Sequence, residues 1–121
     1  MRGYPCQWAA GGVEALARVR AHPKEQPLLV MLDEMMPDLS GIDVLRALRA
    51  DPATVHTSVV MFSAGLNVAK REEAMALGIL DWILKSGDVA MTLKAIIDHY
   101  VRIGGTTVVE TPNSSESKKA E

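Results

Sequence analysis

The stretch Leu28-Leu29-Val30-Met31-Leu32-Asp33 carries the strongest fold signal in this sequence. Five consecutive apolar residues between Pro27 and Asp33 are typical of a strand that is buried on both faces. Such strands belong to parallel sheets that helices cover on both sides. The stretch therefore predicts an α/β protein with an aspartate at the carboxyl end of a buried strand.

Two other apolar runs end in the same way, with a polar residue after the strand. Residues 58–62 run into Ser63, and residues 81–84 run into Lys85. A fourth strand is predicted over 4–8, where Pro5 favours a strand start or a sheet edge.

Helical patterns separate these runs, and the last of them has apolar residues at i, i+3, i+4 and i+7. The predicted helices cover 13–22, 42–49 and 69–77, with a fourth around 93–100. The order βαβαβαβα predicts a doubly wound parallel sheet with right-handed crossovers. Ligands of such sheets bind outside the carboxyl ends of the strands. We therefore expect Asp33, Ser63 and Lys85 to converge at one edge of the sheet.

The composition predicts a single folded domain followed by a tail. The chain has 121 residues, 48% of them hydrophobic and 23% charged, which is typical of a packed globular domain. Residues 104–121 are mostly polar, with Val108 and Val109 as their apolar content among many small and charged residues. We predict a domain over 1–103 and a flexible polar tail over 104–121.

Charge and cysteine content exclude several classes of function. The net charge of −2 argues against a broad nucleic-acid footprint. Cys6 is the single cysteine, so neither an intrachain disulfide nor a cysteine-rich zinc site can form. No apolar run approaches the roughly 20 residues needed to cross a bilayer, and no secretory signal is recognisable. A cytoplasmic location is expected.

The segment LDEMMPDLSG at 32–41 resembles the phosphoacceptor turn of two-component response-regulator receiver domains. The segments at 62–64 (FSA) and 82–85 (WILK) are similar to the two strand ends that follow this turn in that family. Residues 10–16 resemble its second strand-to-helix passage. The resemblance runs from about residue 2 to residue 103.

The resemblance implies a role for each of the residues at these strand ends. Asp33 would accept the phosphoryl group, and Ser63 and Lys85 would contact it. Ser63 and Trp82 would form the conformational switch, in which the aromatic side chain rotates after phosphorylation. Mg²⁺ is expected for the family, held by Asp33, the Met35 backbone carbonyl and two acidic residues of the first strand.

Two departures from the family pattern bear on this site. The family usually has proline after the lysine, often with a cis bond, where this chain has Ser86. Because a cis bond before a residue other than proline costs about 2.5–4 kcal/mol, we expect a trans Lys85-Ser86 bond. In addition, Trp82 is larger than the Tyr or Phe usual at its position, which opposes free rotation.

The largest departure is the absence of the family's first strand, which ends in the acidic pair. The family strand order is 2-1-3-4-5, and no segment before Tyr4 matches the central first strand. The sequence therefore predicts a flavodoxin-like receiver fold that lacks its first βα unit, with a Mg²⁺ site that lacks its acidic pair. Three explanations are open: a gene start assigned too far downstream, a natural truncation, or a gap filled by Val108-Val109 or by a strand of another copy.

Three functions are compatible with these residues. The leading hypothesis is a stand-alone receiver module of a phosphorelay, a signalling protein and not a turnover enzyme. Its partners would be a histidine kinase or phosphotransfer protein and a downstream protein target or second copy, without direct contact to nucleic acid or membrane. The alternatives are a phosphorylation-independent pseudo-receiver and a small hydrolase, which has only Asp33 in its favour.

Overall fold

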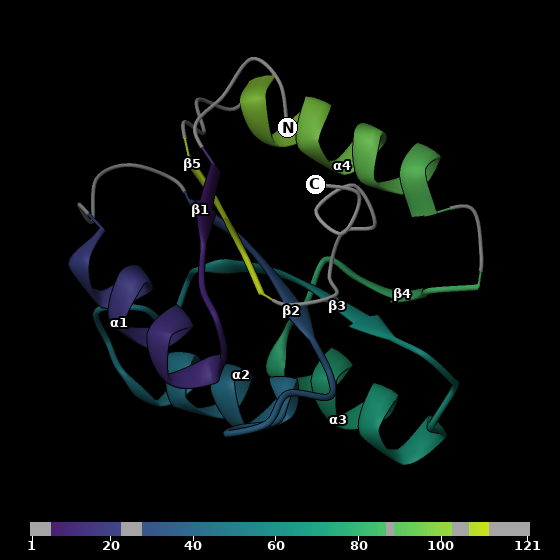
Figure 1. Ribbon diagram of the computed structural model, residues 1–121, viewed down its shortest axis with the longest axis horizontal. Helices are drawn as coiled ribbons and strands as arrows, with labels where there is room; N and C mark the ends of the chain where they lie inside the picture. Colours follow the sequence, from purple (N-terminus) through teal and green to yellow (C-terminus); the bar gives the residue numbers. More distant parts are fainter. Residues whose placement is uncertain (1–5, 23–27, 87–88, 103–106, 112–121) are drawn as a thin grey trace.

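The computed structural model describes residues 6–22, 28–86, 89–102 and 107–111 (Figure 1). Strands and helices alternate along the chain in the predicted order. The elements are β1 (Cys6–Trp8), α1 (Gly12–Ala21), β2 (Leu28–Asp33), α2 (Gly41–Ala50), β3 (Ser58–Ser63), α3 (Val68–Leu77), β4 (Asp81–Leu84), α4 (Val89–Arg102) and β5 (Thr107–Glu110). The strands and helices predicted from the sequence patterns are present with small shifts of their ends, and β5 is additional.

The five strands form one parallel sheet in the order β1-β5-β2-β3-β4. The fold class predicted from the sequence, a doubly wound α/β sheet with the flavodoxin-like arrangement, is confirmed. Because β2, β3 and β4 are neighbours, their carboxyl ends meet at one edge of the sheet. This edge carries the residues that the sequence singled out.

Strand β5 lies between β1 and β2, in the position that the sequence predicted to be empty. Val108 pairs with Cys6 on one side, and Val109 pairs with Val30 on the other. The prediction of a flexible tail is therefore wrong for Thr107–Glu110, while residues 104–106 and 112–121 lie outside the described residues. The strand that contains Val108 and Val109 occupies the gap, as one of the possibilities left open by the sequence proposed. The strand forms because β-branched residues suit a sheet and because β1 and β2 each offer it unpaired backbone groups.

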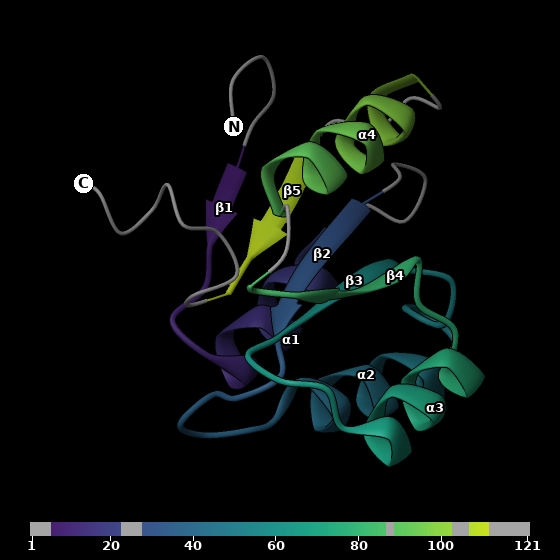
Figure 2. The same cartoon turned by 90° about the vertical axis from the view of Figure 1, so that its right-hand side faces the viewer.

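The helices lie on both faces of the sheet, with α1, α2 and α3 on one side and α4 on the other (Figure 2). Side chains of β2 alternate between these faces: Val30 and Leu32 pack toward α1 and α2, whereas Leu29 and Met31 pack toward α4. These four side chains are fully buried. The continuous apolar run of β2 thus reflects a strand with a core on each face.

None of the described helices is both long enough and apolar enough to cross a bilayer.

Candidate functional site

The carboxyl edge of the sheet brings two of the predicted site residues into direct contact. Asp33 ends β2, and Lys85 follows β4. The ammonium Nζ of Lys85 lies 2.5 Å from Oδ2 of Asp33. The backbone N–H of Lys85 donates to the carbonyl of Ser63, 2.8 Å away, which ties the Lys85 backbone to the intervening strand β3. The Lys85–Ser86 bond is trans, as predicted.

The carboxylate of Asp33 is almost completely enclosed. Its side chain is 2% exposed, against 29% for Lys85. Oδ2 faces Lys85, and Oδ1 accepts a hydrogen bond of 2.9 Å from the backbone N–H of Met35. Each carboxylate oxygen therefore has a donor, as a buried negative charge requires.

Ser63 lies at the same edge, but its hydroxyl is engaged within its own loop. The hydroxyl donates to the carbonyl of Gly65 and accepts from the Gly65 N–H at 3.3 Å. The structure therefore brings Asp33 and Lys85 together and leaves the predicted phosphate-contacting hydroxyl turned toward Gly65.

Trp82 is buried in β4, on the sheet face that α1, α2 and α3 cover. Its residue is 8% exposed, and it belongs to the same hydrophobic cluster as Ala74 of α3. Its indole Nε1 is buried without a hydrogen-bond partner among the described residues. The predicted switch residue thus already lies inside the core, three positions before Lys85.

Sequence reasoning missed Thr111, whose side chain holds the backbone of Asp33. The N–H of Asp33 donates to Oγ1 of Thr111 over 2.8 Å, and this hydroxyl donates to the carbonyl of Met31 over 3.0 Å. Thr111 follows β5 directly and is fully buried. Its sequence signal is weaker than that of Asp33, because Glu110 separates Thr111 from a run of only two valines, which is too short to predict a strand.

Sequence reasoning also missed the ion pair of Glu34 with Lys70 of α3. Glu34 follows Asp33 directly, and its side chain is 6% exposed. The Lys70 ammonium lies 3.0 Å from Oε2 of Glu34 in a geometry that makes no hydrogen bond. Charge attraction across the loop therefore links the end of β2 to α3.

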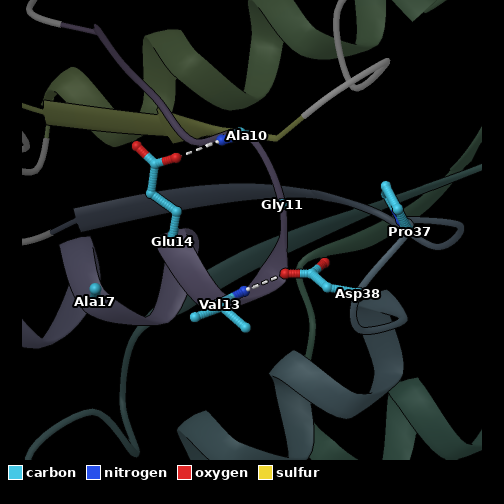
Figure 3. A pocket seen from close by; sticks show the side chains of 7 residues that line it. All are labelled: Ala10, Gly11, Val13, Glu14, Ala17, Pro37 and Asp38. Carbon is cyan, nitrogen blue, oxygen red and sulfur yellow. Dashed lines mark hydrogen bonds between the residues drawn. The ribbon is translucent and has the colours of Figure 1, made fainter.

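Asp38 belongs to a different part of this loop, where it caps α1. Its carboxylate accepts a hydrogen bond of 3.0 Å from the N–H of Val13 (Figure 3) and a second, also of 3.0 Å, from the N–H of Gly12. These backbone donors, Val13 foremost, lower the pKa of Asp38 from 3.8 to about 2. Beside this contact lies an open hollow of about 390 Å³, lined by Ala10, Gly11, Val13, Glu14, Ala17, Pro37 and Asp38. Its lining is mostly apolar, and the two acids in it already accept backbone N–H groups.

The described residues do not fit the Mg²⁺ site that the resemblance implies. Mg²⁺ requires several oxygen ligands in octahedral geometry. Asp33 already faces Lys85, Glu34 faces Lys70, and the side chain that reaches Asp33 from the end of β5 is the hydroxyl of Thr111. In the part of the chain that the structure describes, no three His, Cys, Asp or Glu residues are placed to share a metal ion.

Comparison with known proteins gives a consistent family match. The family model of the response regulator receiver domain matches residues 1–97. The transcriptional regulatory protein KdpE of Mycobacterium tuberculosis is 35% identical over 85 residues, which cover 70% of this chain and 35% of that protein. The phosphate regulon transcriptional regulatory protein PhoB of Pseudomonas aeruginosa is 30% identical over 100 residues, covering 80% and 42%. The chain thus spans less than half the length of these relatives.

Solved structures show the same similarity. The receiver domain of the Francisella response regulator 1452 superposes with a TM-score of 0.61 at 26% identity, covering 77% of this chain and 73% of that one. The chemotaxis protein CheY4 of Vibrio cholerae gives 0.59 at 26% identity, covering 74% and 72%.

Proposed function

Because this chain belongs to the response-regulator receiver family, we propose that it accepts a phosphoryl group on Asp33 and passes the signal on by protein contact. Receiver domains are in general signalling modules of two-component systems and not turnover enzymes. The observation that carries the proposal is the contact of 2.5 Å between Lys85 Nζ and Asp33 Oδ2 at the carboxyl edge of the sheet. The proposal includes a cytoplasmic location.

The donor would be the phosphohistidine of a histidine kinase or of a phosphotransfer protein. A carboxylate oxygen of Asp33 attacks the phosphorus, so that a new O–P bond forms while the N–P bond of the phosphohistidine breaks. The imidazole leaves with the electron pair of that bond and takes up a proton. Asp33 becomes an acyl phosphate, and its local charge falls from −1 to about −2.

The residues around Asp33 would stabilise the charge that develops on the phosphoryl oxygens. The Lys85 ammonium is the nearest cation, and it moves from the carboxylate to a phosphoryl oxygen. The Met35 N–H stays on the remaining carboxyl oxygen. For Ser63 to contribute, its hydroxyl must leave Gly65 and rotate toward the phosphate, which is a displacement of the β3–α3 loop.

The output would be a changed surface around that loop and β4. Trp82 shares a cluster with Ala74 of α3, so a shift of the β3–α3 loop would reach its buried indole. The partner would be a downstream protein target or a second copy of this chain. We propose no direct contact with nucleic acid or membrane.

A pseudo-receiver that works without phosphorylation is the second candidate, and the enclosure of Asp33 favours it. Both carboxylate oxygens are occupied, and the side chain is 2% exposed. An incoming phosphorus atom must displace Lys85 before it can reach Oδ2. In this case the Asp33–Lys85 pair would serve to fasten β4 to β2.

One experiment separates the two candidates. The 121-residue chain is incubated with a small phosphoramidate donor, with and without Mg²⁺, and its intact mass is measured. Phosphoryl acceptance predicts a mass gain of one phosphoryl group that Asp33→Asn abolishes and that the control Asp81→Asn retains. Because the described residues do not fit Mg²⁺, the gain should persist with a chelator.

Absence of any mass gain would overturn phosphoryl acceptance and leave the pseudo-receiver. The comparison requires that a known receiver domain be labelled in the same donor solution. Lys85→Gln provides a further test, because a labelling rate equal to that of the unmodified chain would contradict the role given to Lys85.

A further inference from the structure

We propose that Thr111 is a positioning residue for the phosphoacceptor, so that Asp33 is competent only when β5 is docked. This inference rests on the proposed function, since it concerns phosphoryl acceptance at Asp33. It goes beyond the family pattern because Thr111 reaches Asp33 from a strand that follows all the others in sequence. The two residues are 78 positions apart.

The Thr111 hydroxyl acts as donor and acceptor at the same time. It accepts the N–H of Asp33 at 2.8 Å and donates to the carbonyl of Met31 at 3.0 Å. The backbone N–H of Thr111 donates to the same carbonyl at 3.1 Å. A hydroxyl is the smallest side-chain group that can fill both roles, and valine, which has the same shape, fills neither.

These bonds fix the backbone of Asp33 from one side, while β3 fixes it from the other. The N–H of Glu34 donates to the carbonyl of Phe62 over 2.8 Å. The backbone at Asp33 and Glu34 is therefore held by two hydrogen bonds, one from the Asp33 N–H to the Thr111 hydroxyl and one from the Glu34 N–H to β3. Its carboxylate meets Lys85 because this backbone is held, so loss of the Thr111 bond would loosen the approach to Lys85.

Burial raises the free-energy cost of losing the hydrogen bond between Thr111 and Asp33. Thr111 is fully buried and the Asp33 residue is 1% exposed, so water cannot replace the lost hydroxyl without entering the sheet. Val109, two positions before Thr111 in β5, is 1% exposed and belongs to the core cluster. The hydroxyl is therefore placed by the same packing that docks β5.

The test compares Thr111→Val with Thr111→Ser and with a matched control in the full 121-residue chain. The control is Thr54→Val, because Thr54 is also buried and its hydroxyl donates to the Leu48 carbonyl at 2.8 Å, away from the site. Two quantities are measured: hydrogen exchange of the Asp33 amide by ¹⁵N NMR, and the labelling rate at saturating phosphoramidate.

Thr111→Val should raise exchange of the Asp33 amide by about tenfold and lower the maximal labelling rate by about fivefold or more. The donor concentration at half-maximal rate should stay unchanged, because Thr111 does not touch the donor. Thr111→Ser should restore both quantities. Thr54→Val should leave both at the values of the unmodified chain.

Failure of this inference can be distinguished from failure of the proposed function. If the unmodified chain is labelled and Thr111→Val is labelled at the same rate, the positioning role is overturned while phosphoryl acceptance stands. If the unmodified chain is not labelled, both fail. A change in hydrogen exchange of the Asp33 amide would then show that the Thr111 bond stabilises the sheet and has no role in phosphoryl acceptance.

Discussion

At the scale of single residues, polar side chains at the ends of β2 and β4 and in the loop after β2 carry out different tasks in this protein. Asp33 and Lys85 form an enclosed ion pair, and Asp38 caps a helix. The ion pair was predictable because each partner directly follows an apolar run. The capping role of Asp38 was not, since its donors at Gly12 and Val13 lie at the start of α1, 26 and 25 positions away.

Asp38→Asn should lower the stability of the protein and remove part of its acid sensitivity. The folded-state pKa of Asp38 is lowered to about 2, so the charged carboxylate stabilises the fold above its unfolded pKa of 3.8. That contribution is lost as the pH falls from about 4 toward about 2. Urea unfolding of the chain between pH 6 and pH 2.5 should therefore show a decline that Asp38→Asn flattens. Glu72→Gln on the exposed side of α3 serves as the control, and an identical decline in Asp38→Asn would contradict the cap.

At the scale of elements, the loop after β2 contacts both α2 and α3. The Gly41 N–H, at the start of α2, donates to the Glu34 carbonyl at 3.0 Å, and the side chain of Glu34 faces Lys70 of α3. This loop therefore joins β2 to two helices. The close packing of these elements leaves no room for a side chain at Gly41 and buries the side chain of Glu34.

Gly41→Ala should destabilise the protein by about 1–3 kcal/mol. A Cβ at this position would lie 2.8 Å from the backbone carbonyl oxygen of Asp33 and 2.6 Å from the sulfur of Met61. The backbone oxygen cannot move without displacing β2. Gly65→Ala is the matched control, because a Cβ there has no neighbour within 4 Å. Equal denaturation midpoints for the two variants would show that the approach of α2 to β2 is looser than described.

Lys70→Met should lower the free energy of unfolding by about 1–3 kcal/mol, because it leaves the carboxylate of Glu34 buried without a cation. Adding Glu34→Gln to Lys70→Met should recover part of that loss, since the unpaired charge is removed. Lys94→Met is the control: Lys94 is paired with Asp98, but its side chain is 78% exposed, so the change should cost less than about 0.5 kcal/mol. Chemical denaturation of the four chains measures these differences. A double variant no more stable than Lys70→Met would exclude the charge explanation.

At the scale of the whole molecule, the sheet depends on a strand that the sequence offered only as one of several possibilities. Apolar runs and helical periods predicted the other four strands and the four helices. Strand β5 carries two apolar residues, Val108 and Val109, in a polar segment, and its pairing partners lie in β1 and β2, far away in sequence. Thr111 was missed for the same reason, since a side chain can be assigned to the site only after its strand has been placed.

Val109→Asp should abolish cooperative folding or cost more than about 3 kcal/mol, because it places a charge in the centre of the sheet. Val109 is 1% exposed and pairs with Gln7 on one side and Val30 on the other. Amide exchange in both β1 and β2 should increase together. Val13→Asp is the control, as Val13 is 61% exposed at the start of α1. Retained protection of the β1 and β2 amides in Val109→Asp would show that β5 is dispensable.

The position of β5 also has a consequence during synthesis. The ribosome makes β1 and β2 long before β5. During this interval, the edges of β1 and β2 that later pair with β5 have no partner strand. Unpaired strand edges invite pairing with other chains, and contacts between distant residues form slowly. Newly made protein should therefore depend on holding chaperones until residues 107–111 have emerged.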